Sequence, residues 1–182
     1  MIMTYKDCID KYRTDYQLKK ALERNEVFQL EAGIYSNDKY ASRFEIISVK
    51  YPKAIFTMNS AFYYYDLTDS IPKADYLATS RGARKITDSG IKQIYENSNC
   101  FGLGKTTVKN NGAIINIYNK ERMLVELLRH KNSMPFDYYK EIIENFRLLI
   151  SNGELDLPLI QDYVFSLPKQ NMIMKALQLE VL

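Results

Sequence analysis

Residues 99–106, Asn-Cys-Phe-Gly-Leu-Gly-Lys-Thr, come nearest to a known chemical motif. They fall one glycine short of the phosphate-binding P-loop, G-x-x-x-x-G-K-[ST], because Asn99 stands where the first glycine is required. A P-loop lies between a strand and a helix, so that backbone N–H groups point at the phosphates. Here residues 107–109, Thr-Val-Lys, are typical of a strand instead. The surrounding pattern therefore argues against nucleotide binding.

His130 is the only histidine, and Cys8 and Cys100 are the only cysteines. A zinc site or a Cys–His pair would have to be assembled from single residues that lie far apart in the sequence. His130 falls at the end of an expected helix, where a positive group interacts favourably with the helix dipole. We predict no metal site, no cofactor and no catalytic residue, and two cysteines that stay free in a reducing compartment.

Two pairs of acidic residues have a spacing that acid–base catalysis could use: Asp66 with Asp69, and Glu121 with Glu126. Helix capping and solvated helix faces explain both pairs more simply. The aromatic run 62–65, Phe-Tyr-Tyr-Tyr, could stack on nucleic-acid bases, but a helical segment that is aromatic all round is more often buried. Taken together, these residues favour a protein that is not an enzyme.

The first 36 residues have the order of elements found in the last part of a winged helix-turn-helix. Thr4 can cap a helix that ends near Arg13, and Thr14 with Gln17 forms a capping box for a second helix. Residues 27–30 and 34–35 then read as two short strands around Gly33. We predict a short winged helix-turn-helix over residues 1–36.

The second of these helices carries the candidate DNA-binding residues. With its apolar positions buried, it would point four polar side chains outward for phosphates and base edges: Gln17, Lys19, Lys20 and Arg24. Against this, residues 1–35 hold six Lys/Arg and six Asp/Glu. Duplex binding depends on net positive charge, so a solvated helix face is the alternative reading.

The positive charge of the chain is concentrated in residues 79–110, which hold six Lys/Arg against two Asp/Glu, whereas the whole chain carries +3. Three of these cations fall close together and are added to the candidate DNA-binding residues: Arg81, Arg84 and Lys85. Such a stretch can face phosphates or an acidic partner, but a merely solvated surface fits the composition equally well.

The rest of the chain is predicted to be one α+β domain over residues 37–182. A helix within residues 40–50 and an aromatic helix at 59–66 flank a strand at 54–57. Further strands are expected at 75–79, 91–96, 106–109 and 113–118, with a hairpin turn at Asn110-Asn111-Gly112. They would form a small, mostly antiparallel sheet over roughly residues 54–118. Helices are expected at 119–130 and 136–150, and two more begin at Pro158 and Pro168.

Length and composition agree with an ordinary globular protein. Of 182 residues, 46% are hydrophobic and 26% are charged. No apolar run approaches the 18 or so residues of a membrane span, and the N-terminus lacks the regions of a secretory signal. A cytoplasmic protein without a membrane partner is the simplest expectation.

Three blocks of sequence resemble a known family. Residues 30–35, Leu-Glu-Ala-Gly-Ile-Tyr, are similar to its wing motif. Residues 51–61 and 66–72 look like its Pro, Ser-Ala and Leu-Thr-Asp…Pro block, and residues 117–129 resemble its strand-to-helix segment with a Glu-Arg pair. The family is AbiEi, the antitoxins of type IV abortive-infection toxin–antitoxin systems, which are also described as regulators of viral defence.

The resemblance implies a two-part protein. An N-terminal winged helix would bind the promoter of its own operon, with residues 14–25 as the recognition helix and 27–35 as the wing. A C-terminal domain would neutralise an AbiEii-like toxin that resembles a nucleotidyltransferase. Glu121 and Arg122 would be structural and would tie the helix start to the sheet.

The same resemblance leaves an alternative. Family members usually have a further helix before the helix-turn-helix, whereas three residues precede Thr4 here, so a truncated domain is expected. The chain would then be either a DNA-binding autorepressor or an antitoxin that acts by protein interaction and has no specific affinity for DNA.

Overall fold

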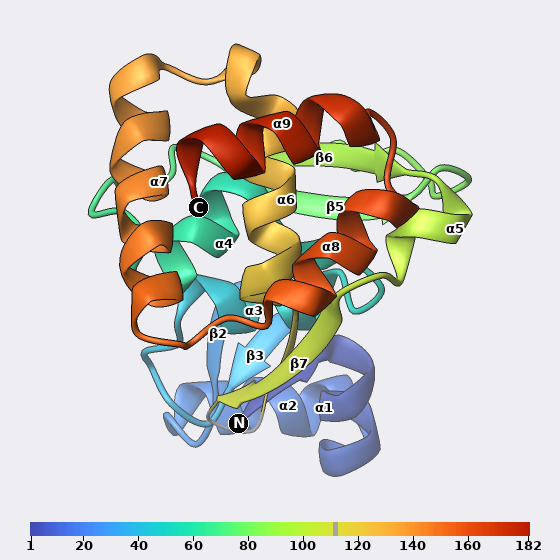
Figure 1. The fold of residues 1–182 in the computed structure, drawn as a ribbon. Coiled ribbons are helices and arrows are strands. Elements are labelled where there is room, and N and C mark those ends of the chain that lie inside the picture. The colour runs from blue at the N-terminus through green and yellow to red at the C-terminus, as the bar shows by residue number, and fades with distance from the viewer. Residues whose placement is uncertain (111–112) are drawn as a thin grey trace. The chain divides into compact units, whose positions relative to one another are not determined.

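The computed structural model describes residues 1–110 and 113–182, which divide into two compact units. Unit 1 comprises Met1–Ala54 with Thr107–Asn116, and unit 2 comprises Ile55–Thr106 with Ile117–Leu182. The chain is an α+β protein, as the sequence predicts (Figure 1). The boundary after residue 36 stays a prediction.

Unit 1 begins with two short helices whose ends are fixed by side chains. α1 (Tyr5–Tyr12) has a full capping box, in which Thr4 Oγ1 accepts from Asp7 N and the Asp7 carboxylate accepts from Thr4 N. Arg13 ends α1 in the left-handed region, with φ 68°. α2 (Asp15–Glu23) follows at once, because Thr14 Oγ1 accepts from Gln17 N at 3.2 Å. Both predicted helix starts are confirmed.

A three-stranded antiparallel sheet completes the N-terminal part of unit 1. Its order is β1 (Ile2–Thr4), β3 (Ile34–Ser36) and β2 (Phe28–Glu31). The hairpin β2–β3 is confirmed, and Gly33 adopts φ +77° in its turn. The sequence did not predict β1, since three residues are too few for an alternating pattern and its pairing with β3 is long-range.

One hydrophobic cluster holds these helices and strands together. Its buried members come from β1, α1, α2, the start of the hairpin and β3: Met3, Cys8, Leu18, Ala21, Val27 and Tyr35. α3 (Arg43–Lys50) packs on β1 and β3, and Ser42 and Glu45 form a second capping box at its start. Glu31 of β2 pairs with Arg43 at 2.6 Å and with Lys50 at 3.1 Å.

The second sheet has five strands in the order β6-β5-β4-β8-β7. They are β4 (Ile55–Phe56), β5 (Asp75–Ser80), β6 (Ile91–Glu96), β7 (Lys105–Asn110) and β8 (Ala113–Tyr118). β4 pairs antiparallel with β5 but parallel with β8, and β5 and β6 are parallel. Residues 111–112 of the predicted hairpin turn lie outside the described residues.

The prediction of a mostly antiparallel sheet is therefore wrong. The sheet is mixed, because β5–β6 and β4–β8 are parallel pairs. Residues 81–90 run back along the sheet, so that β6 starts again beside Asp75. The side chain of Gln93 holds this connection, because it accepts from Ile86 N at 2.8 Å and donates to Arg84 O at 3.2 Å.

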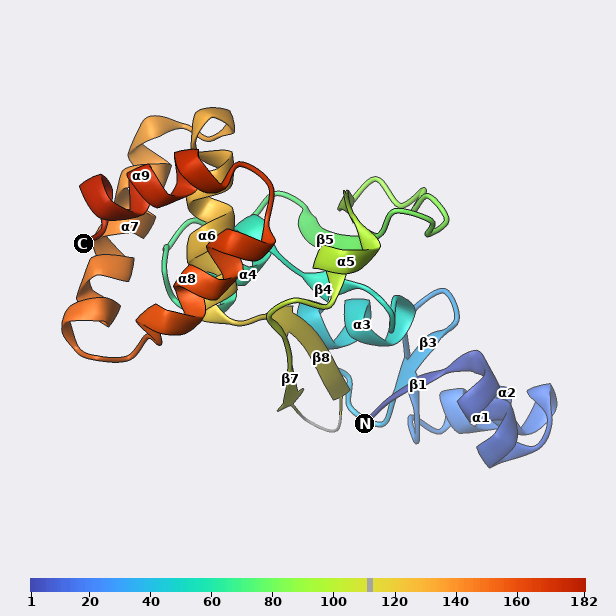
Figure 2. The same ribbon diagram turned by 45° about the vertical axis from the view of Figure 1, so that its right-hand side comes forward.

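The helices of unit 2 are α4 (Met58–Tyr64), α5 (Ser98–Phe101), α6 (Lys120–His130), a short 3-10 helix (Lys131–Ser133), α7 (Phe136–Ser151), α8 (Leu157–Ser166) and α9 (Gln170–Glu180). Within this unit, α6 is buried along most of its length (Figures 1 and 2). α6 contacts α4, α8 and α9. Among the described residues, no helix is both long and apolar enough to cross a bilayer.

Gly104 lies close against the start of α6. It has φ +73°, and a Cβ built on it would lie 2.6 Å from Arg122 Cβ and 2.9 Å from Asn119 Oδ1. Asn119 N also donates to Gly104 O at 2.8 Å. Both the backbone conformation and the lack of space therefore require glycine here.

We expect Gly104→Ala to lower the free energy of unfolding by about 2–4 kcal/mol, because it adds left-handed strain to a steric clash. Urea denaturation measures the change. Gly82→Ala is the matched control, since nothing lies within 4 Å of its Cβ position; its effect should stay within about 0.5 kcal/mol. Equal stability of the two variants would contradict this role of Gly104.

Candidate functional site

Three of the predicted DNA-binding residues lie on α2, and the fourth, Arg24, is its C-cap residue. Leu18 and Ala21 are buried beneath the helix. Gln17, Lys19 and Arg24 are exposed, as the helical pattern predicts. Lys20 is half-buried, and its Nζ lies 4.5 Å from the centre of the Tyr16 ring, an arrangement in which the ring attracts the ammonium. The exposed side of α2 thus combines cationic, amide and aromatic groups.

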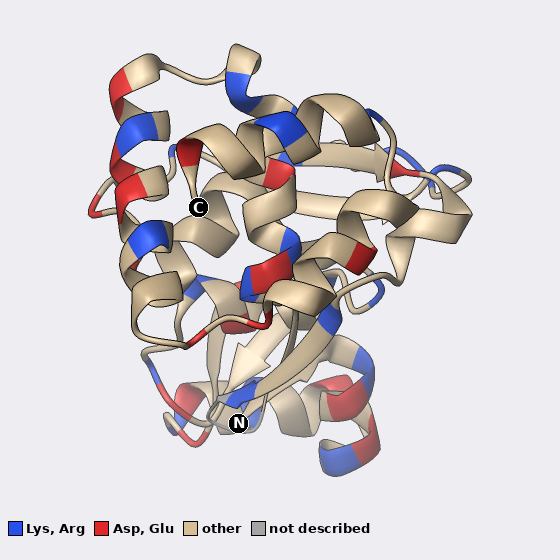
Figure 3. Ribbon diagram, in the orientation of Figure 1, with Lys and Arg blue, Asp and Glu red and all other residues tan. Residues whose placement is uncertain are grey.

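Acidic side chains share this side of α2. Arg24 Nη1 lies 3.9 Å from Glu26 Oε1, and both side chains are more than half exposed. Asp15 accepts a 2.5 Å hydrogen bond from the Tyr5 hydroxyl, and this bond raises the pKa of Tyr5. Figure 3 shows acidic and basic positions interspersed along α1 and α2. The surface is mixed in charge and is not a continuous positive patch.

The other three predicted residues, Arg81, Arg84 and Lys85, lie in the connection between β5 and β6 in unit 2. All three are exposed. Arg81 Nη1 donates to Asn97 Oδ1 at 3.3 Å, and the carbonyl of Arg84 is held by Gln93. The structure thus brings the seven predicted residues together as two sets, four in unit 1 and three in unit 2.

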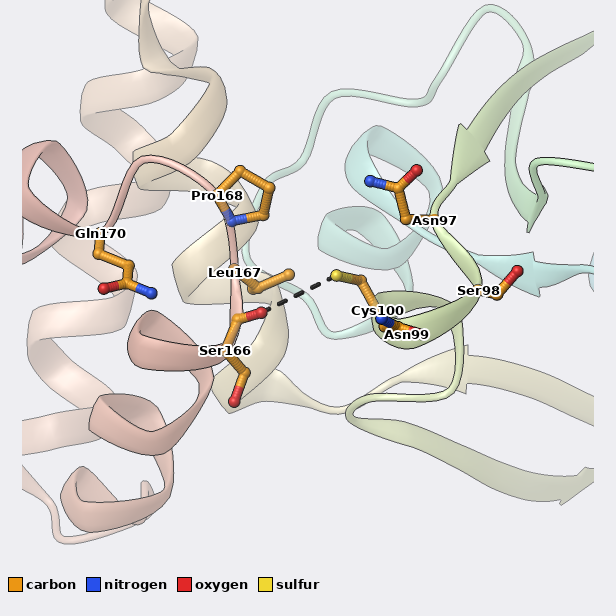
Figure 4. A pocket seen from close by; sticks show the side chains of 8 residues that line it. All are labelled: Asn97, Ser98, Asn99, Cys100, Ser166, Leu167, Pro168 and Gln170. Carbon is orange, nitrogen blue, oxygen red and sulfur yellow. Dashed lines mark hydrogen bonds between the residues drawn. The ribbon is translucent and has the colours of Figure 1, made fainter.

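The segment that resembles a P-loop has the opposite order of elements. The short helix α5 precedes the turn, and Lys105 and Thr106 lie in strand β7. A pocket of about 570 Å³ opens beside α5 and the α8–α9 connection (Figure 4). It is lined mainly by amide, hydroxyl and apolar groups, and Cys100 Sγ lies 3.9 Å from Ser166 O. Among the described residues that line the pocket, the Cys100 thiol is the one ionisable side chain.

A network of buried ion pairs lies on one side of α6. Arg122 is fully buried, and its Nε donates to Glu126 Oε1 at 2.8 Å. Arg129 Nη2 lies 2.9 Å from Glu126 Oε2 and 2.5 Å from Glu96 Oε1. His130 Nε2 lies 3.4 Å from Glu126 Oε2. Two carboxylates and two guanidinium groups are thereby balanced inside the protein.

Arg122 also binds the turn that precedes β7. Its Nη1 donates to Cys100 O at 3.2 Å and to Leu103 O at 3.4 Å, and its guanidinium lies 4.8 Å from the centre of the Tyr118 ring. Glu121, its neighbour, instead accepts from Asp156 N at 3.3 Å. Arg122 thus has a structural role: it connects α6 to the segment that leads into β7.

The network corrects one interpretation of the sequence. Glu126 was assigned to a solvated helix face, but it is 2% exposed. Burial by itself raises the pKa of Glu126, but the hydrogen bond to His130 and the charges of Arg122 and Arg129 together lower it by more, so that the net shift is downward. The i,i+4 spacing to Arg122 and the i,i+3 spacing to Arg129 were the available signal. The sequence around Glu96 carries no such signal, because its partner Arg129 is far away in the sequence.

Three other predictions concern the aromatic run, His130 and metal binding. Phe62 is fully buried, which confirms core packing for that member of the aromatic run. Tyr65 is half-buried and donates to Tyr118 O at 2.8 Å. His130 is the last residue of α6, as predicted. In the described part of the chain, no group of three or more His, Cys, Asp or Glu could hold a metal ion.

No protein-family model matches the chain, and no curated protein matches it. The resemblance to the AbiEi antitoxins therefore depends on the three sequence blocks alone.

We expect Glu126→Gln to lower the free energy of unfolding by about 3–5 kcal/mol at pH 7, because it leaves two buried guanidinium groups without full compensation. Because folding lowers the pKa of Glu126, its stabilising contribution is present above the ordinary value of 4.5 and is lost as the pH falls through the lowered value. The difference between wild type and variant should therefore shrink at acid pH, as measured by denaturant unfolding across pH.

Glu121→Gln is the matched control on the same helix. Among the described residues, its carboxylate accepts one exposed hydrogen bond, from Asp156 N, so the change should stay within about 1 kcal/mol. A pH-independent difference for Glu126→Gln would contradict the proposed cause.

Proposed function

We propose that the N-terminal part of unit 1 is a winged helix-turn-helix that binds DNA, and that the chain is an AbiEi-like antitoxin that represses its own operon. The observation that carries the DNA-binding part is the order β1-α1-α2-β2-β3, closed over one hydrophobic cluster with the outer side of α2 exposed. In a helix-turn-helix the second helix enters the major groove. Here that helix is α2.

The side chains of α2 supply the chemistry that a duplex requires. Gln17 carries an amide that can hydrogen-bond base edges, and Lys19 and Arg24 are exposed cations for phosphates. The ammonium group of Lys20 lies over the Tyr16 ring, which favours this position of the side chain. Arg81, Arg84 and Lys85 are proposed as additional phosphate contacts.

The antitoxin role rests on the family resemblance. Its three blocks fall on the β2–β3 hairpin, on the segment from the end of α3 through β4 and α4, and on the end of β8 with α6. The third block contains Arg122 and Glu126 of the buried network. The proposed partner is an AbiEii-like, nucleotidyltransferase-like toxin encoded beside it.

A second function is favoured by the charge on α2. Asp15 and Glu23 lie on the same helix as the cations, Glu26 pairs with Arg24, and residues 1–35 hold equal numbers of acidic and basic residues. A surface of mixed charge is better suited to binding a protein than to binding DNA, because sequence-independent attraction to DNA depends on net positive charge. In this alternative the chain is an antitoxin whose helix-turn-helix no longer binds a specific DNA sequence.

Fluorescence anisotropy with a duplex from the region upstream of its own gene, compared with a scrambled duplex across a salt series, separates the two functions. For the repressor we expect tighter, salt-sensitive binding to the upstream duplex. Lys19→Ala combined with Lys20→Ala should weaken it roughly tenfold and lower the slope of log K against log salt by about 1.8, since each lost phosphate contact contributes about 0.9.

Lys140→Ala combined with Lys175→Ala is the matched control, because it removes the same charge from exposed positions on α7 and α9. It should leave binding unchanged. Equal, weak binding of wild type to both duplexes would exclude the repressor and support the interaction protein.

A further inference from the structure

A small acidic pocket lies in unit 1, where the start of β1, the end of β3 and the first turn of α3 meet. Its volume is about 290 Å³. Met1, Ile2 and Ala41 supply apolar surface to its walls. The polar groups in its lining include two carboxylates, Asp38 and Glu45. No lysine or arginine side chain lines it, and Met1 carries the ammonium group of the N-terminus.

Glu45 has a carboxylate oxygen without a partner. The residue is 2% exposed, and its Oε2 accepts from Ser42 N at 2.9 Å as part of the capping box of α3. Its Oε1 is buried and has no hydrogen-bond partner. An unsatisfied buried carboxylate oxygen is costly, so a donor that reaches it is strongly favoured.

Two further acceptors lie around the same pocket. Ser36 is 1% exposed, and its Oγ accepts from Asp38 N at 3.0 Å, while the hydroxyl retains further hydrogen-bonding capacity. Asp38 Oδ1 accepts from Tyr40 N at 3.1 Å, which leaves Oδ2 available. In the described part of the chain neither Asp38 nor Glu45 has a basic ion-pair partner. The side chains that line the pocket therefore include two carboxylates and no cationic group, beside apolar walls.

We propose that this pocket binds a primary alkylammonium group, such as a free amine or a lysine side chain. The three N–H donors of an ammonium match the acceptors of Glu45, Asp38 and Ser36. An alkyl stem fits the apolar surface of Ile2 and Ala41. Tyr40 is 81% exposed and lines the pocket, so its ring can attract a cation bound there.

The geometry favours an ammonium over other cations. A guanidinium group is best matched by both oxygens of one carboxylate, but Glu45 Oε2 already accepts from Ser42 N, so that Oε1 alone is wholly free. Metal ions are disfavoured as well, because the described residues contain no group of three or more His, Cys, Asp or Glu around such a site.

The test titrates the full chain with n-butylammonium and follows its backbone amide resonances by NMR. We expect saturable shifts at Ser36, Asp38 and Glu45, with a dissociation constant in about the millimolar range for so small a ligand. n-Butanol, which has the same stem without the charge, should produce no saturable shift. Two further ligands then distinguish a free amine from a lysine side chain. Tighter binding of 1,4-diaminobutane would identify a free amine, and tighter binding of the peptide acetyl-Ala-Lys-Ala-amide would identify a protein lysine.

Glu45→Gln should weaken n-butylammonium binding at least tenfold. Glutamine still accepts from Ser42 N in a capping box, so α3 is retained and the amide spectrum verifies the fold. Glu144→Gln is the control, because Glu144 lies on α7 and is largely exposed; it should not change the affinity. Absence of saturable shifts, equal shifts with n-butanol, or unchanged affinity in folded Glu45→Gln would overturn the proposal. The readout requires no DNA, so it is independent of the repressor function.

Discussion

The ion pair between Arg122 and Glu126 constrains most of unit 2. Once these two charges are buried, each must keep its partner, because water cannot replace a lost one. A rotation of α6 about its axis would separate Arg122 from the carbonyls of Cys100 and Leu103 and Arg129 from Glu96. These polar contacts therefore restrict the orientation of the helix, together with the packing of its buried apolar residues.

Features set by neighbouring residues could be predicted from the sequence. The caps at Thr4, Thr14 and Asn119 act over three residues, and the structure contains all three. β1 and the parallel pairing of β5 with β6 could not be predicted in this way. Both depend on contacts between distant segments, and a strand of three residues carries no periodic signal.

The candidate sites differ in the same respect. The exposed side of α2 follows from the positions of Leu18 and Ala21, so its residues were identified from spacing alone. The pocket at Glu45 was missed. Ser42 and Glu45 have the local spacing of a capping box, but only the packing of α3 on β1 and β3 encloses the second carboxylate oxygen.

The hydrogen bonds of Gln93 have a consequence for the connection between β5 and β6. By binding Arg84 O and Ile86 N, this one side chain fixes backbone that would otherwise sample many conformations. An anionic partner that meets Arg84 and Lys85 would therefore order their side chains and little of the backbone. Ordering a loop costs conformational entropy and so opposes association. Because the backbone of this connection is already ordered, binding a partner would cost less conformational entropy.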